Sequence, residues 1–358
     1  IRKALDDNCR PVDVRQILES DTPYDKNLWK VLGEMGLHGT AIDDSLGGAG
    51  AGYLELCVVA EELGRALAPV PFTSSVFMAT EAIKIAASEE QQAALLPDLA
   101  SGKKIGTVAA WERTGPLRAD AMTVRCDNGL LSGTKMLVPD GDVADLAIVI
   151  AKEDAGLSLF AVDLTDKGVT RTTLETIDPT RNFSTLSFHA VAAQRLGVAG
   201  EGWALLQQVL DRAAVLVAFE QIGGAQKALE MATDYARERY AFGRPIGSFQ
   251  AVKHMLANMY VDLELARSNC YYGAWALSTD ADELPLAAAT ARVSATQAFQ
   301  HCSKNNIQTH GGMGFTWEFD SHVFYRRSNM LAVLLGGQSV WKSLCLIHTY
   351  RRRQRGKA

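Results

Sequence analysis

Residues 235–246 read YARERYAFGRPI, and residues 308–315 read QTHGGMGF. The first stretch predicts a long helix that ends in a turn, because Gly243 and Pro245 cannot continue a helix and the arginines before them suit the negative end of its dipole. The second stretch predicts a helix that ends at paired glycines, where bare backbone can approach a phosphate closely. Together they place the ends of two helices, each suited to bind an anion, in one helical region.

Working outward from these stretches, the texture of the chain changes twice. Residues 1–105 repeat apolar positions at helical spacing, interrupted by a loop at 43–48. Residues 106–195 carry short β-branched runs between polar turns, which predict a compact β domain with strands at 122–125, 146–150, 159–162 and 185–188. Residues 196–358 return to helix, with four long helices expected at 203–239, 249–277, 284–308 and 329–350. Long helices with short connections predict a bundle.

At these segments the chain resembles the acyl-CoA dehydrogenase family. The R-x-x-F-G-x-P-I pattern of that family matches residues 239–246, and its Q-x-x-G-G-x-G pattern matches residues 308–314. Near the start, GLHG at 36–39, GGAG at 47–50 and EELGR at 61–65 are similar to the N-terminal helical domain of the family. The resemblance covers nearly the whole chain. It implies an α+β fold with an N-terminal helical domain (1–105), a middle β domain (106–195) and a C-terminal four-helix bundle (196–358).

The resemblance also implies a cofactor and partners. It points to FAD, an acyl-CoA substrate, a role in fatty acid or lipid catabolism, a homo- or hetero-tetramer, and an electron-transfer flavoprotein as the electron acceptor. A fixed guanidinium beside an aromatic ring suits a pyrophosphate and the group next to it. The residues expected to bind the cofactor are Arg239, Phe242, Gln250, Gln308, Gly311 and Gly312.

The carboxylate base of the reaction is missing from its usual places. In the resembled family this base removes the α-proton of the thioester while a hydride passes to the flavin. Its usual glutamate position corresponds here to Gly336, and the alternative position on the first long bundle helix corresponds to Ala213. Glu220, two turns further along that helix in an apolar setting, is the remaining candidate, either as the base or as a buried structural group.

Other flavin and substrate segments depart from the family as well. Residues 111–117 read WERTGPL where the family has T-E-P-G-x-G-S-D, and residues 136–139 read MLVP where it has W-I-T. Asp211 and Arg212 match a helix position that contacts the pantetheine arm in relatives, but the arginine expected three residues after the aspartate is Ala214. Two interpretations follow: a dehydrogenase with an unusual base, or a non-catalytic subunit that completes the FAD site of a partner chain.

Composition narrows the remaining classes. The 358 residues are 47% hydrophobic and 22% charged, which predicts a large core and two or three domains. The net charge of −5 argues against nucleic-acid binding. Six cysteines without a C-x-x-C pair, and scattered histidines, predict no metal site and a reducing, cytoplasmic compartment. Neither a signal peptide nor a membrane span is expected.

Overall fold

The computed structural model describes residues 1–355, which form two compact units. The sheet unit contains Gln16–Leu56 and Pro69–Ala213. The bundle unit contains Ile1–Arg15, Cys57–Ala68 and the described residues from Ala214 onward. Three of the four boundaries between the units fall inside helices, namely α2 (Pro11–Leu18), α4 (Tyr53–Arg65) and α7 (Gly202–Glu238), and the fourth follows α4, between Ala68 and Pro69.

The sheet unit is built on one seven-stranded sheet. Its strands are β1 (Gly106–Ala109), β2 (Arg125–Asp127), β3 (Leu130–Pro139), β4 (Leu146–Glu153), β5 (Gly156–Asp163), β6 (Val169–Leu174) and β7 (Phe183–Leu196). They pair in the order β1-β4-β2-β3-β7-β5, with β6 on β7. Because β4 also pairs with β5 over its whole length, the path closes on itself like a barrel.

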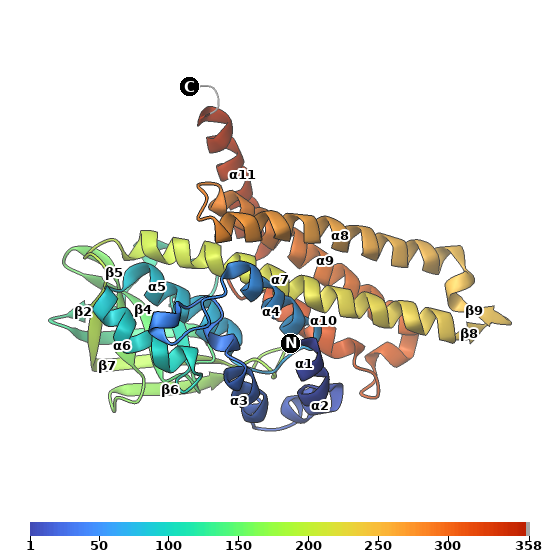
Figure 1. The fold of residues 1–358 in the computed structure, drawn as a ribbon, viewed down its shortest axis with the longest axis horizontal. Helices are drawn as coiled ribbons and strands as arrows, with labels where there is room; N and C mark the ends of the chain where they lie inside the picture. The colour runs from blue at the N-terminus through green and yellow to red at the C-terminus, as the bar shows by residue number, and fades with distance from the viewer. Residues whose placement is uncertain (356–358) are drawn as a thin grey trace. The chain divides into compact units, whose positions relative to one another are not determined.

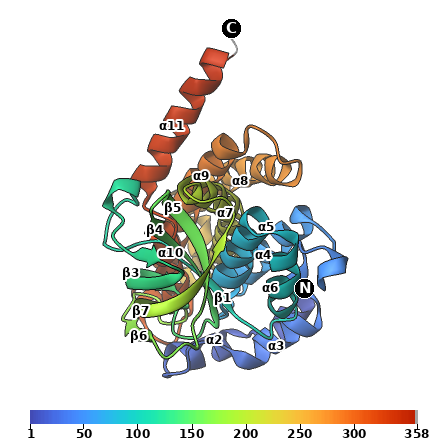
Figure 2. The ribbon, with the colours of Figure 1, turned by 90° about the vertical axis from the view of Figure 1, so that its left-hand side faces the viewer.

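Short helices and helical turns complete the sheet unit. They are α3 (Lys26–Glu34), α5 (Glu81–Ala86) and α6 (Glu89–Ala100), together with the turns η1 (Leu37–Gly39), η2 (Asp44–Leu46), η4 (Ala119–Ala121) and a fully buried π-type turn, η3 (Thr73–Thr80). Asp25 and Ser88 cap α3 and α6 by accepting hydrogen bonds from backbone N–H groups of the first helical turn. Figure 2 looks onto the strands, with α5 and α6 to the right of β1.

The bundle unit contains the long helices. They are α8 (Gln250–Ser278), α9 (Leu284–His310), α11 (Gln338–Arg355) and most of α7, and the unit also holds the shorter helices α1 (Arg2–Asn8) and α10 (Ser321–Val333). A small hairpin of β8 (Tyr240–Ala241) and β9 (Arg244–Pro245), followed by the turn η5 (Ile246–Ser248), joins α7 to α8, and the turn η6 (Gly311–Phe315) follows α9. Figure 1 shows the hairpin where α7 ends and α8 begins.

Two glycines let α4 and α7 approach closely. A Cβ on Gly64 would collide with the carbonyl oxygen of Glu220, and one on Gly223 would collide with the carbonyl oxygen of Glu61. Only glycine fits at such a backbone contact. The glycine of the EELGR motif is therefore explained by helix packing.

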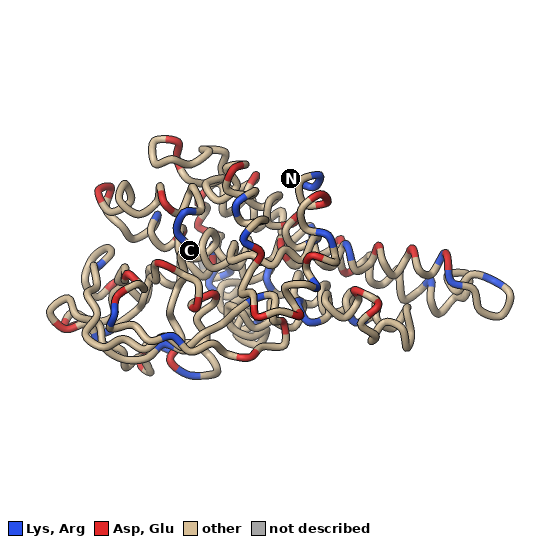
Figure 3. Tube along the Cα trace, turned by 90° about the horizontal axis from the view of Figure 1, so that it is seen from below, with Lys and Arg blue, Asp and Glu red and all other residues tan. Residues whose placement is uncertain are grey.

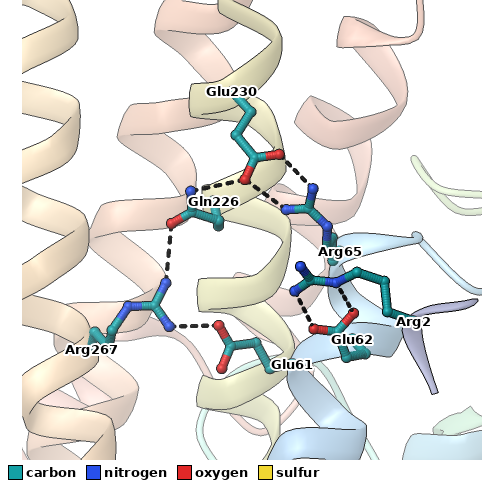
Figure 4. Close-up of polar contacts among 7 residues, drawn as sticks. All are labelled: Arg2, Glu61, Glu62, Arg65, Gln226, Glu230 and Arg267. Carbon is teal, nitrogen blue, oxygen red and sulfur yellow. Dashed lines mark hydrogen bonds and ion pairs between the residues drawn. The ribbon is translucent and has the colours of Figure 1, made fainter. Parts of the chain in front are cut away.

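The charged residues of the same motif form a network around this crossing (Figure 4). Arg65 donates to both carboxylate oxygens of Glu230 on α7 at 2.8 and 2.5 Å. Gln226 links Glu230 to Arg267 on α8, whose guanidinium lies 2.5 Å from the carboxylate of Glu61. Beside this chain of contacts, Glu62 forms a two-point ion pair with Arg2 on α1. The motif thus ties α1, α4, α7 and α8 together.

The predicted sequence of helix, strand and helix is confirmed, but two expected elements were wrong. The helix expected at 329–350 is broken into α10 and α11, which are bent by 49°. Gly336 has a φ of +94°, which a right-handed helix does not allow, and its N–H closes a turn onto the carbonyl of Val333. The strand expected at 122–125 begins only at Arg125, because the N–H groups of Thr123 and Val124 donate to the Glu112 carboxylate instead of a neighbouring strand.

Charged residues of both signs are interspersed along the chain, as Figure 3 shows. Within residues 1–355, no helix by itself has both the length and the apolar composition to cross a membrane, although the bent α10–α11 pair meets the criterion jointly.

Candidate functional site

The hairpin after α7 fixes the position of Arg239. Phe242 and Gly243 have φ values of 54° and 76°, which a two-residue hairpin turn of the primed type requires. Tyr240 pairs with Pro245, and the N–H of Ile246 donates to the carbonyl of Arg239 at 2.8 Å. The guanidinium of Arg239 is therefore carried on a backbone that is closed just after the helix ends.

The hairpin presents an aromatic ring to solvent. The Phe242 side chain is 95% exposed and meets the ring of Phe249 edge to face, with 6.2 Å between centroids. The Arg244 guanidinium lies 4.1 Å from the centroid of the Phe249 ring. Burial inside this chain cannot explain an exposed phenylalanine in an ordered turn, so the ring is available to another molecule.

The glycine pair lies at the same end of the bundle. The ring of His310, the last residue of α9, stacks on Tyr235 of α7 with 4.2 Å between centroids, and Tyr235 is one helical turn before Arg239. Gly311 has a φ of 63°, and a Cβ on Gly311 or Gly312 would meet no atom within 4 Å. The backbone of both glycines is therefore open to a close approach.

We call the six predicted cofactor residues the bundle tip: Arg239, Phe242, Gln250, Gln308, Gly311 and Gly312. All six are exposed. Within residues 1–355, the side chains of Arg239, Gln250 and Gln308 form no hydrogen bond or ion pair, so their donors are free. A free guanidinium, two amides, an exposed ring and open glycine backbone fit the pyrophosphate of a dinucleotide and the groups next to it.

The predicted substrate residues belong to the sheet unit. The Arg212 guanidinium donates to the Tyr53 hydroxyl at 3.1 Å and lies 3.8 Å from the carboxylate of Glu81, which is 1% exposed. Lys84 donates to the same hydroxyl at 2.7 Å. Next to this cluster in sequence, loss of water contact raises the pKa of the half-buried Asp211 to about 7. Arg212 is therefore held by this internal polar cluster.

Glu220 lies in the core of the bundle unit. Its carboxylate is 3.5 Å from the guanidinium of Arg327, and both side chains are 1% exposed. Arg327 also donates to the carbonyl of Leu67 at 3.3 Å. Arg292, equally buried, donates to Gln221 and to the carbonyl of Leu331 on α10. Glu220 thus serves as the anion in a buried, largely cationic network.

Neither expected base position holds an acid. A Cβ on Gly336 would have only Val340 nearby, at 4.0 Å, and Ala213 is fully buried on α7. In the sheet unit, Glu112 belongs to the 111–117 segment that differs from the family pattern, and its carboxylate lies 2.7 Å from the fully buried Lys135 amine. Burial lowers the pKa of Lys135 to about 8 in spite of this carboxylate. Within residues 1–355, no group of three or more His, Cys, Asp or Glu side chains is arranged to hold a metal ion.

Sequence reasoning missed two of these clusters. Glu81 stands in an apolar run, the same signal that singled out Glu220, and could have been found in that way. Arg15 binds the loop at residues 317–320, about 300 positions away along the chain, and no sequence signal marks that contact.

Comparison with known proteins identifies relatives over about nine tenths of the chain. Residues 1–103 match the family model for the "Acyl-CoA dehydrogenase, N-terminal domain", and residues 200–344 match the model for the "Acyl-CoA dehydrogenase, C-terminal domain". The chain is 34% identical to acyl-CoA dehydrogenase IpdE2 of Mycobacterium tuberculosis over 91% of this chain and 87% of that protein. It is 30% identical to human mitochondrial short-chain specific acyl-CoA dehydrogenase over 90% and 82% of the two chains.

Solved structures agree with these relatives. A Tcur3481–Tcur3483 steroid ACAD variant superposes with a TM-score of 0.89 at 31% identity, covering 99% of this chain and 96% of that chain. The ChsE4–ChsE5 complex from Mycobacterium tuberculosis gives a TM-score of 0.87 at 30% identity, covering 99% and 94%. Family descriptions, relatives and fold therefore agree, and the chain belongs to the acyl-CoA dehydrogenase family.

Proposed function

We propose that this chain is a subunit of a hetero-oligomeric, FAD-dependent acyl-CoA dehydrogenase, in which its bundle tip completes the FAD site of a partner chain. The observation that carries the proposal is the contrast between two sites. The bundle tip retains a full set of free, exposed dinucleotide groups, while both positions expected for the catalytic base hold residues without a carboxylate.

The exposure of the tip supports a cofactor held jointly with another chain. Arg239 supplies a guanidinium for the pyrophosphate, Gln250 and Gln308 supply amide donors, and the Gly311–Gly312 backbone admits the phosphate oxygens without a steric barrier. Phe242 offers a flat apolar face to the neighbouring ring or sugar. FAD supplies the hydride acceptor when it is bound. The part of this chain is to bind and orient the dinucleotide end.

The ion pairing of Glu220 supports the structural alternative for that residue. A catalytic base must reach the substrate proton, whereas the carboxylate of Glu220 is 1% exposed and lies beside Arg327. Removing it would take away a negative charge that interacts with the buried guanidinium groups of Arg327 and Arg292. We propose that Glu220 stabilises the bundle core.

Two relatives with paired names favour a heteromeric assembly. The Tcur3481–Tcur3483 steroid ACAD and the ChsE4–ChsE5 complex each combine two differently named chains. We propose a tetramer of this chain with a homologous, base-carrying partner, a bulky steroid-type acyl-CoA as the first substrate to test, and an electron-transfer flavoprotein as the acceptor. A self-sufficient dehydrogenase remains the second candidate, favoured by the 30% identity to the human short-chain enzyme.

Mutation of the bundle tip tests the proposal. Arg239→Ala in the complex, prepared by co-expression with a homologous, base-carrying partner chain, is expected to lower flavin content, because it removes the free guanidinium. Arg237→Ala is the matched control, since Arg237 is an exposed arginine of the same helical turn that pairs with Asp234 at 3.6 Å. Equal flavin content in wild type and Arg239→Ala complexes would contradict the proposed role of the tip.

A further inference from the structure

The loop between α9 and α10 carries the glycine pair and needs support from other elements. Its first part is held by the Ser321 hydroxyl, which donates to the carbonyl of Gly314 at 2.8 Å. Near its end, the ring of Phe319 lies edge to face against His310 and Tyr235, with centroids 5.4 and 6.2 Å away. Residues 317 and 318 lie between these two anchors.

Arg15 on α2 holds this middle part. Its Nε donates to the carboxylate of Asp320 at 2.7 Å, its Nη1 to the carbonyl of Trp317 at 2.8 Å, and its Nη2 to the carbonyl of Glu318 at 3.1 Å. Nη2 also lies 2.6 Å from the Asp320 carboxylate. One planar guanidinium can satisfy these three acceptors only while the loop keeps its present backbone geometry. The contact therefore specifies the loop conformation.

The start of α10 is buried but borders a cavity. Asp320, Val323 and Phe324 line a cavity of about 290 Å³, together with Leu5 of α1 and Val14 of α2. Side chains that face a cavity lose the contacts that would otherwise hold them in place. The polar contact of Arg15, whose side chain is 27% exposed, adds a restraint to the apolar packing.

We propose that Arg15 is a positioning residue for the cofactor loop: by fixing residues 317–320, it holds the Gly311–Gly314 backbone where the pyrophosphate is bound. This proposal rests on the proposed function, because it assumes that the bundle tip binds FAD. Arg15 itself touches no cofactor group. It acts through the loop.

Two measurements on the purified, co-expressed complex test the proposal. Arg15→Gln is expected to raise the FAD dissociation constant about tenfold, since several hydrogen bonds to one cation are lost. It is also expected to speed amide hydrogen exchange in residues 311–320 of the flavin-free complex, a readout that does not depend on activity. Arg15→Lys keeps the positive charge but not the several N–H donors of the planar guanidinium. Its FAD affinity and loop exchange are expected to lie between those of the wild type and those of Arg15→Gln.

Arg10→Gln is the matched control. Arg10 immediately precedes α2 and pairs with Asp13 at 3.0 Å on an exposed surface, so its loss removes the same charge without touching the loop. Wild-type FAD affinity in Arg15→Gln overturns the proposal, whether or not loop exchange changes. If Arg239→Ala also leaves the affinity unchanged, the proposed function fails as well; if Arg239→Ala weakens binding while Arg15→Gln does not, only the role of Arg15 is lost. Should Arg15→Gln not fold, Asp320→Asn in the same assay replaces it, with the same two outcomes.

Discussion

Replacing His38 is predicted to remove a large part of the acid sensitivity of the sheet unit. The imidazole is 1% exposed, stacks on Trp29 with 3.8 Å between centroids, and lies 5.6 Å from the ring of Phe72. Among the described residues, neither of its ring nitrogens has a hydrogen-bond partner. This apolar setting lowers the pKa of His38 from 6.5 to about 4.

The sign and size of the effect follow from proton linkage. Above pH 6.5 the imidazole is neutral in both the folded and the unfolded chain, and the burial of His38 costs nothing in charge. As the pH falls from 6.5 to about 4, the unfolded chain takes up a proton that the folded chain refuses, so the free energy of unfolding decreases. At 1.36 kcal/mol per pKa unit, the loss reaches about 3 kcal/mol near pH 4.

Urea unfolding of wild type and His38→Met at several pH values between 7.5 and 4 measures this loss. Methionine does not titrate and adapts to irregular space, and the orphaned nitrogens mean that no hydrogen bond is broken. Other groups titrate alike in both proteins and cancel in the difference, including Asp140, whose pKa burial raises to about 6. The gap between the two unfolding free energies is expected to change by about 3 kcal/mol across this range. If the unfolding free energies of the two proteins fell by the same amount between pH 6.5 and 4, the reasoning would be refuted.

Three further substitutions have defined outcomes. Gly64→Ala should destabilise the chain by more than about 3 kcal/mol in urea unfolding, because its Cβ collides with the Glu220 carbonyl, whereas Gly337→Ala, with no atom within 4 Å, should change little. Glu220→Gln should lower the unfolding free energy by about 3–5 kcal/mol and leave the reduction rate per bound flavin unchanged in stopped-flow assays; a slow, stable variant would make Glu220 the base. Gly336→Glu should cost about 1–2 kcal/mol for its positive φ and create no dehydrogenase activity in the chain alone; measurable turnover of an acyl-CoA would contradict the account.

The fold was predictable because its signals are local. Apolar periodicity and the punctuation by Gly243 and Pro245 located α7, α8 and α9 to within a few residues. The break at Gly336 was missed, because an isolated glycine is compatible with a helix until its φ is known. The start of β2 was misplaced, because the hydrogen bonds that displace it come from Glu112, about ten residues earlier in the chain.

The exposed position of the predicted cofactor residues could be predicted from the sequence because they lie where helices end. The motifs at 239–246 and 308–314 contain their own turns, so their exposure at one end of the bundle follows from helix geometry. Contacts between distant segments carry no such mark. Two ion pairs, Glu220 with Arg327 and Arg15 with Asp320, depend on which helices pack together. The spacing of residues in the sequence does not specify the packing of helices.

The flavin content of the purified protein tests the central claim most directly. The chain would be purified alone and again after co-expression with homologous chains encoded next to its gene, and the flavin absorbance would be compared with the amount of each chain. We predict a colourless chain alone and one flavin for each pair of chains in the complex. A yellow chain that binds one FAD by itself and is bleached by an acyl-CoA would contradict the account and establish a self-sufficient dehydrogenase.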